Sequence, residues 1–289
     1  MKYTTMERCR HTFSIRLMCR CLKVSPSGYY AWRKRPPGRR AKDNERLLGR
    51  IKDLYAASDE ALGGPRMWEE LRFEGETCSR NRVARLMRVN GLRGVPQRRR
   101  WRKKASGPRP VGVENHLARD FVSGKPNTKW VTDITYIRTG EGWLYLCVVV
   151  DLFSKRVVGW SMGPRQDRSM VLQAVLMALW QREETTEVIL HSDRGTQFTS
   201  DEYQTFLAGH NLICSMSAVG TCADNAAAES FFGLLKRDRV HRRQYTTRSE
   251  ARIDVFDYIE RFHNPRMNRR LERLAREEAA LTQPSVISG

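Results

Sequence analysis

Hydrophobic residues follow two different spacings along this chain. Up to about residue 95 they recur every three or four positions, as on one face of an amphipathic helix. From residue 127 they form short runs bounded by turn residues, which are typical of strands. The pattern therefore predicts an all-helical region followed by a domain that contains a β-sheet.

Within the helical region, two neighbouring helices with a short connection are the most informative feature. Residues 67–73 have helical spacing, Gly75 follows as a helix stop, and Ser79 is of the residue type that caps the next helix. A helix, a short glycine turn and a second helix are the parts of a helix-turn-helix, which we expect within residues 46–96.

The second of these helices has two contrasting faces on a helical wheel. Its apolar face consists of Val83, Leu86 and Met87. Its basic side consists of Arg82, Arg85 and Arg88, and Arg80 lies two residues before Arg82. These arginines are candidates for DNA contacts, although a helical hairpin whose arginines merely face water would have the same pattern.

In the second part of the chain, the predicted elements follow the order βββαβαβα. Three strands within residues 127–163 form a meander, and alternating helices and strands follow it to about residue 240. Such an order gives an α/β fold with a mixed five-stranded sheet flanked by helices. Three tryptophans are expected in its core: Trp143, Trp160 and Trp180.

The net charge of +20 is concentrated in the first part of the chain. Residues 1–112 contain 29 Lys and Arg against 10 Asp and Glu, a balance of +19, whereas residues 113–289 are nearly neutral at +1. This asymmetry indicates a nucleic-acid-binding region joined to a domain with another task. A basic linker at residues 97–120 adds further candidate DNA-binding residues, namely Arg98, Arg99, Arg100, Lys103 and Lys104.

The cysteine pattern and the hydropathy narrow the class of protein further. The seven cysteines form no CxxC pair and have no zinc-finger spacing to histidines, so free thiols in a reduced compartment are expected. The N-terminus lacks an apolar signal core, and the longest apolar run, residues 144–150, is far shorter than the roughly 20 residues of a membrane span. We expect an intracellular protein with no membrane partner.

Three carboxylates stand out in the α/β domain because of their surroundings and spacing. Asp133 lies inside the first strand, Asp193 ends the fourth, and Glu229 lies in the last helix, with 35 residues between it and Asp193. A carboxylate within an apolar strand is costly to bury unless it is paired or binds a metal. Oxygen ligands from two strands and a helix suit hard divalent cations, and two Mg²⁺ ions suit phosphodiester chemistry.

The predicted helix around Glu229 has a broad apolar face, made by Phe231, Phe232, Leu234 and Leu235. Glu229 points away from this face, and Lys236, seven residues later, returns to the side of Glu229. A lone pair of this kind is most often a solvated helix surface. Its definite distance from Asp193 instead favours a carboxylate and a lysine that act on a metal and a phosphate backbone.

Two other polar residues have competing interpretations. Asp151 is a candidate metal ligand if the hairpin brings it close to Asp133, but a hydrogen bond to Ser154 in the following turn is the preferred interpretation. His191 either contacts a DNA strand or forms a hydrogen bond to the backbone where its strand ends, and the sequence leaves both open.

Several segments, taken together, resemble one known family. The segments are WVTDITYI, VVVDLFSKRVVGW, HSDRGTQFTS and DNAAAESFFGLLK. With the D(35)E spacing and the lysine seven residues after the glutamate, they resemble the integrase core of bacterial insertion-sequence transposases. More narrowly, the chain resembles the OrfB-type proteins of insertion-sequence family three, which are related to retroviral integrases. VSPSGYYAW and SRNRVARLMRVNGLRG are similar to the upstream helical regions of that family.

The resemblance implies a catalytic core with an RNase H-like fold and a DDE motif. Asp133, Asp193 and Glu229 would be the catalytic residues and would hold two Mg²⁺ (or Mn²⁺) ions, and Lys236 would contact DNA near the cleaved phosphate. We expect five segments: a helical region at 1–45, the helix-turn-helix domain at 46–96, the linker at 97–120, the integrase core at 121–270 and a C-terminal tail at 271–289.

The resemblance also implies the activity and the partners. The protein would bind the double-stranded ends of an insertion sequence, cleave them hydrolytically and join the freed 3′-hydroxyl to target DNA. It would work as a homo-oligomer on DNA in the bacterial cytoplasm, associated with the nucleoid, and a fusion with an upstream-frame protein is a possible active form. Two alternatives remain at this point: an inactive copy that occupies the ends and represses, and a host nuclease of RNase H type.

Overall fold

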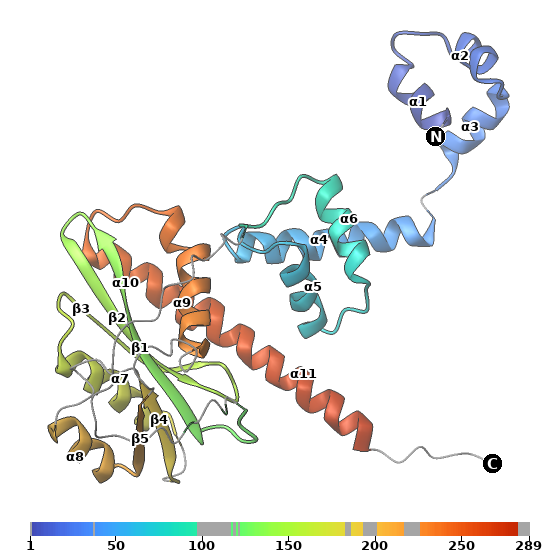
Figure 1. The fold of residues 1–289 in the computed structure, drawn as a ribbon. Helices are drawn as coiled ribbons and strands as arrows, with labels where there is room; N and C mark the ends of the chain where they lie inside the picture. The colour runs from blue at the N-terminus through green and yellow to red at the C-terminus, as the bar shows by residue number, and fades with distance from the viewer. Residues whose placement is uncertain are drawn as a thin grey trace, which may run out of the picture. The chain divides into compact units, whose positions relative to one another are not determined.

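A computed structural model gives the structure of the chain (Figure 1). It describes residues 2–36, 38–96, 117, 120, 122–182, 186–192, 201–216 and 226–282. The chain forms two compact units, residues 1–52 and 53–289. The predicted free thiols are present at the six cysteines that these ranges include.

The first unit is helical. It contains α1 (Lys2–Cys9), α2 (Ile15–Leu22), α3 (Pro26–Lys34) and the beginning of α4 (Arg39–Ala57). The expected segment boundary after residue 45 falls inside α4, because the helical spacing of this stretch continues without a break to Ala57.

The predicted helix pair forms the start of the second unit as α5 (Gly64–Phe73) and α6 (Arg80–Val89). Gly75, which follows α5, has φ of +88°, a conformation that glycine adopts without steric cost. The Ser79 side chain accepts a hydrogen bond from the Arg82 backbone amide at 3.3 Å and caps α6. The predicted apolar face of α6 is buried and consists of Val83, Leu86 and Met87.

The described strands form one five-stranded mixed sheet, as predicted. They are β1 (Lys129–Thr139), β2 (Gly142–Asp151), β3 (Val157–Gly163), β4 (Val188–Ser192) and β5 (Leu212–Met216). Their order across the sheet is β3-β2-β1-β4-β5. The first three strands are antiparallel, whereas β4 runs parallel to both β1 and β5. This arrangement of a meander and two parallel strands is the RNase H-like fold.

Helices cover both faces of the sheet, as the predicted order requires (Figure 1). Buried side chains of α7 (Arg168–Trp180) and α8 (Asp201–Gly209) pack on one face. Those of α9 (Ala226–Asp238) and α10 (Arg248–Phe256) pack on the other. The first layer is very close to the sheet, since a Cβ at Gly159 of β3 would lie 2.1 Å from the Ala174 carbonyl oxygen of α7.

Helical structure continues far beyond α9. A 3₁₀ turn, η2 (Val240–Arg242), precedes α10, and a π-helical segment, η3 (Asp257–His263), joins α10 to α11 (Asn264–Thr282). The expected C-terminal tail at 271–289 therefore begins inside a helix. The Asn264 side chain anchors the start of α11 to the sheet, because it accepts from the Val157 amide at 3.0 Å and donates to the Val157 carbonyl at 2.9 Å.

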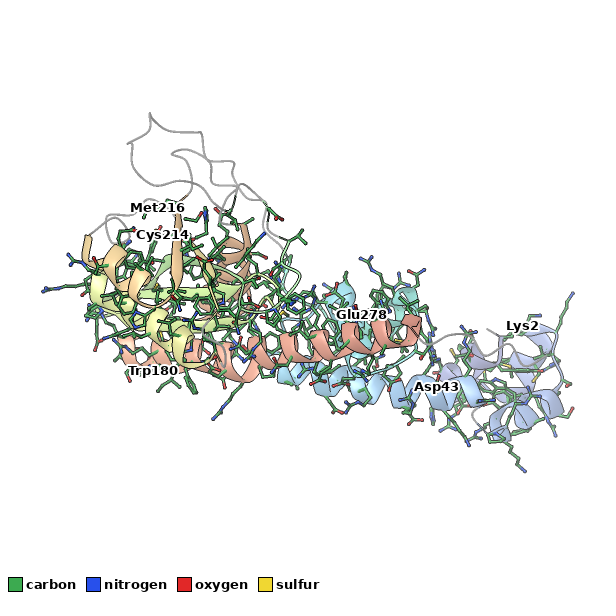
Figure 2. All side chains as sticks on the ribbon, turned by 90° about the horizontal axis from the view of Figure 1, so that it is seen from below. Lys2, Asp43, Trp180, Cys214, Met216 and Glu278 are labelled. Atoms are coloured by element: carbon green, nitrogen blue, oxygen red, sulfur yellow. The ribbon has the colours of Figure 1, made fainter. Side chains whose placement is uncertain are left out.

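The prediction that three tryptophans lie in the core was wrong for two of them, Trp143 and Trp180. Trp180 is 83% exposed (Figure 2), because it lies nearly opposite the buried stripe of α7 on a helical wheel. Trp143 is also exposed and stacks edge-on against Tyr136, with ring centroids 5.1 Å apart. Trp160 is half-buried and donates a hydrogen bond to Glu260 at 2.7 Å. None of the described helices is long and apolar enough to cross a membrane.

Candidate functional site

Asp133 lies in the middle of β1, on the face of the sheet that α9 covers. Successive side chains of a strand alternate between the two faces. Val131 and Ile137, which share the parity of Asp133, belong to the core formed with α9. Asp133 is half-buried opposite Val148 of β2, and its carboxylate accepts the Ile134 amide at 2.8 Å. The predicted position inside an apolar strand is confirmed.

Helix α9 brings Glu229 to the same face of the sheet. Ala228, Phe231, Phe232 and Leu235 are buried against the sheet, and Leu234 is half-buried. These side chains hold the helix, so the half-buried Glu229 is not needed for that packing. Glu229 is also the acidic residue in the first turn of α9, where the helix dipole favours a negative charge.

Lys236 lies two turns after Glu229, next to β1. Its ammonium group is 4.9 Å from the ring centroid of Tyr136, a cation–π contact between α9 and β1. Tyr136 is 57% exposed, so this contact lies at the solvent boundary of the sheet. A lysine whose ammonium group lies at the solvent boundary can reach a phosphate.

Asp193 lies outside the residues that the structure describes. The strand before it, β4, pairs with β1 in parallel, with His191 opposite Val131, and ends at Ser192. Among the described residues, no three His, Cys, Asp or Glu side chains are arranged to hold a metal ion. The three-carboxylate set includes Asp193 and therefore stays a prediction.

The two ambiguous polar residues have structural partners. Asp151 is buried, and its carboxylate accepts the Ser154 amide at 2.8 Å and the Ser154 hydroxyl at 2.6 Å, as preferred from the sequence. It lies opposite Trp130 rather than near Asp133, because the hairpin turns at residues 140–141. His191 is fully buried with Nδ1 2.9 Å from the Ser215 hydroxyl, so its bond is to a side chain of β5.

A basic cleft lies beside α9, and the sequence did not reveal it. The cavity has a volume of about 620 Å³, and α5, α9, η3 and α11 form its walls. Its cationic lining consists of Arg72, Lys155, Arg266, Arg270 and Arg273. Ala226, Ala227 and Ser230 of α9 also line it, so the cleft adjoins the turn that carries Glu229.

Lys155 and Arg270 are cations of the cleft that form no ion pair with another described residue. Burial, and then the nearby Arg270 guanidinium, lower the pKa of Lys155. Neither side chain forms an ion pair with any residue in the described ranges, whereas Arg266 pairs with Glu70 and Arg72 with Glu277. Two positive charges close enough for one to lower the pKa of the other attract an anion. A phosphate of a nucleic-acid backbone has the required charge.

His263 forms part of the wall of this cleft and is almost fully buried. Its ring lies edge-on to Phe231 of α9, with centroids 4.9 Å apart, and its Nε2 is 2.9 Å from the Lys155 carbonyl oxygen. Burial lowers the pKa of His263 to about 4, although the bond to the Lys155 carbonyl opposes this shift. The imidazole is therefore neutral at pH 7 and donates its Nε2 hydrogen to that carbonyl.

The low pKa of His263 makes the free energy of unfolding depend on pH. Below about pH 6.5 the unfolded chain takes up a proton at His263, whereas the folded chain does so only near pH 4. The contribution of His263 to the free energy of unfolding should therefore fall by roughly 3 kcal/mol between these two pH values and stay constant below pH 4. Urea unfolding of the wild type and of His263→Gln from pH 7 to 4 measures this loss of free energy. Parallel profiles for the two proteins would contradict the assignment.

Three of the four candidate arginines on α6 are exposed, as a DNA-reading face requires. These are Arg80, Arg85 and Arg88, whereas Arg82 is half-buried. The remaining basic candidates lie outside the described residues and stay predictions: Arg98, Arg99, Arg100, Lys103 and Lys104.

Family descriptions match most of the chain. One called "Integrase core domain" matches residues 124–222, and a second with the same description matches residues 229–278. One called "HTH-like domain" matches residues 42–100. The matched regions include β1, the helix of Glu229 and the α5–α6 pair.

Similar individual proteins are known as well. The chain is 42% identical over 268 residues to Transposase InsF for insertion sequence IS3A of Escherichia coli (strain K12), which covers 91% of this chain and 92% of that protein. It is 36% identical over 248 residues to the Insertion element IS600 uncharacterized 31 kDa protein of Shigella sonnei, with 86% and 91% covered. Among solved structures, the catalytic domain of Mos1 mariner transposase matches with a TM-score of 0.39 and 12% identity, over 53% of this chain and 82% of that one.

Proposed function

The chain belongs to the family of insertion-sequence transposases that includes InsF of IS3 and is itself a transposase, and we propose that it cleaves and joins DNA strands through Asp133, Asp193 and Glu229. The integrase-core and HTH-like regions make it a DNA-acting enzyme. The three residues, their metal ions and the order of the steps are the parts that we propose.

The observation that carries this proposal is the arrangement of three elements at one place on the sheet. Asp133 is half-buried on the face that α9 covers, and Glu229 is half-buried in the first turn of α9. β4 lies beside β1 and ends at the residue before Asp193. The D(35)E spacing thus joins elements that are neighbours in the fold.

The donor set fits a hard divalent cation. All three side chains are carboxylates, and Mg²⁺ and Mn²⁺ prefer oxygen ligands, of which phosphates and waters can supply the rest. Asp133 is in a strand whose neighbours are Val, Ile and Thr, where a counter-charge offsets the cost of burying a carboxylate. Bound divalent ions would lower the pKa of a water or a 3′-hydroxyl and offset the charge on the leaving oxygen.

The surrounding residues would hold the DNA backbone. Lys236 would contact a phosphate next to the cleaved bond, since it lies on the helix of Glu229 and reaches solvent at Tyr136. Lys155 and Arg270, which both line the basic cleft, would hold a phosphate of the same DNA there. The exposed arginines of α6 would bind the DNA end farther from the reacting bond.

The proposed reaction has two steps. Water attacks the phosphorus at the end of the element, the bond to the 3′ oxygen breaks, and a 3′-hydroxyl and a 5′-phosphate remain. The hydroxyl then attacks a phosphodiester of the target DNA, where one P–O bond forms as another breaks. No covalent bond to the protein is required. We expect the protein to act as a homo-oligomer, and a fusion with an upstream-frame protein is a further candidate for the active form.

The proposal is tested by cleavage and joining on labelled DNA. We expect nicked and joined products on duplexes that carry the ends of the element, with Mg²⁺ or Mn²⁺, and none after chelation with EDTA. The matched control is a duplex of the same length and base composition with the end sequence shuffled. Equal cleavage of both duplexes would instead favour a nuclease without end recognition. Binding without cleavage under every metal condition would favour an inactive repressor.

A further inference from the structure

The first compact unit contains a helix pair joined by a very short turn. Only Lys23, Val24 and Ser25 separate α2 from α3. Lys23 has φ of +51°, and the Val24 amide closes the end of α2 by bonding to the Cys19 carbonyl at 3.0 Å. The Ser25 side chain accepts the Gly28 amide at 3.0 Å and caps α3. Two helices with a three-residue connection have the form of a helix-turn-helix.

A small aromatic core fixes which side of α3 faces inward. Tyr29 is fully buried, and the ring of Trp32 lies 5.8 Å from that of Tyr3 on α1. A Cβ at Gly28 would lie 2.5 Å from the Tyr3 hydroxyl, so α3 packs against α1 as closely as a glycine allows. Gly28, Tyr29 and Trp32 therefore form the inner side of α3, and the opposite side is free to face a ligand.

The outer side of α3 is a continuous exposed stripe. It consists of Ser27, Tyr30, Ala31 and Lys34, which have the spacing of one helix face. Ser27 and Ala31 are small enough to let the helix approach a surface closely. Tyr30 is 48% exposed. Tyr30 and Lys34 are the two longer side chains of the stripe, and they can extend from the helix into a groove of the partner.

The charge of this segment identifies the class of partner. Residues 2–36 contain nine Lys and Arg and a single acid, Glu7. Glu7 is already engaged by the Tyr29 hydroxyl and by Arg10, 2.9 Å away. The segment precedes residue 42, where the HTH-like match begins. A protein partner would have to be strongly acidic, whereas double-stranded DNA offers uniform negative charge and a groove that accepts a helix.

We propose that α2 and α3 form a second helix-turn-helix, separate from α5 and α6, and that α3 enters the major groove of DNA through its exposed stripe. In this arrangement one chain would contact a DNA end at two places. The inference does not depend on the three carboxylates, since binding can be measured without cleavage.

The test uses the full chain and a duplex that carries one end of the element, in EDTA so that cleavage does not intervene. Three single variants are compared with the wild type: Tyr30→Ala, Lys34→Ala and, as a matched control, Arg8→Ala. Arg8 is also exposed and basic but lies on α1, away from the stripe. Affinity by titration and the protected bases by hydroxyl-radical footprinting are recorded. Far-UV circular dichroism checks that each variant is folded.

We expect both stripe variants to weaken binding roughly tenfold and to lose one contiguous part of the footprint. Arg8→Ala should weaken binding less than about threefold and leave the footprint unchanged. Three results would overturn the proposal: unchanged footprints in the stripe variants, the same uniform weakening in all three variants, which indicates diffuse charge, or a loss of self-association with DNA binding intact, which indicates a protein-binding face.

Discussion

Replacing Glu229 by glutamine is expected to lower the rate of strand cleavage and joining by about 10³-fold or more, while DNA binding stays within about twofold of the wild type. The amide has nearly the same size as the carboxylate but lacks the negative charge that a divalent ion requires. The variant should remain folded, because the buried Ala228, Phe231 and Leu235 pack α9 against the sheet. Time courses on labelled element ends measure the rates, and titrations in EDTA measure the binding.

The matched control for this variant is Glu272→Gln. Glu272 is an exposed glutamate on α11 whose side chain forms no hydrogen bond or ion pair with the other described residues, while its backbone carbonyl accepts a hydrogen bond from Arg276. The same chemical change there should leave both cleavage and binding unaltered. Asp133→Asn should behave like Glu229→Gln, since both carboxylates belong to the proposed metal site. Full activity in Glu229→Gln would exclude this site assignment, even if the protein is a working transposase.

The elements that local spacing controls were predictable from the sequence. The buried face of α6 and the packing of α9 follow from residues three or four apart, and the alternation along β1 puts Asp133 on a definite face. The mixed five-stranded sheet follows from the predicted meander and the helices that alternate with strands after it. For this reason the surroundings of Asp133 and Glu229 match the expectation, whereas Asp193 stays a prediction.

The helices after α9 were not predictable in the same way. Pro265 lies near the start of α11, directly after the π-helical segment η3, although a proline inside a helix usually kinks or breaks it. The side-chain bonds of Asn264 to Val157 link positions 107 residues apart, so no local pattern announces them. The basic cleft has the same origin, because its wall depends on the pairing of Arg266 with Glu70 across 196 residues.

Replacing Asp238, the last residue of α9, by alanine is expected to cause a large loss of stability. Its side chain is 2% exposed and accepts two hydrogen bonds from Arg66 of α5, at 3.0 and 2.7 Å, and one from Arg237 at 3.0 Å. Asp238→Ala would leave the largely buried Arg66 guanidinium without its carboxylate. Removing one partner of a buried ion pair costs about 3–5 kcal/mol. Urea unfolding of the variant should show a loss of that size.

Two comparisons separate the ion pair from a general loss of packing. In the double variant Arg66→Ala/Asp238→Ala, the loss should be smaller than the sum of the two single losses, because the Arg66 guanidinium is no longer left buried without its carboxylate. Glu277→Gln should lose at most about 1 kcal/mol, since Glu277 is 47% exposed where it pairs with Arg72. Additive losses in the double variant would contradict the assignment.

The contribution of Asp238 should also depend on pH in a definite direction. Burial by itself would raise the pKa of this carboxyl, but hydrogen bonds and charge from Arg66 and then Arg237 hold it below its usual value. The unfolded chain takes up a proton at Asp238 near pH 4, before the folded chain does. The stabilisation is therefore complete above that pH and is lost as the pH falls through the lower, folded-state pKa. The difference in unfolding free energy between the wild type and Asp238→Asn should narrow below about pH 4, and a difference that stays constant to pH 2.5 would show that the charge of Asp238 does not stabilise the fold.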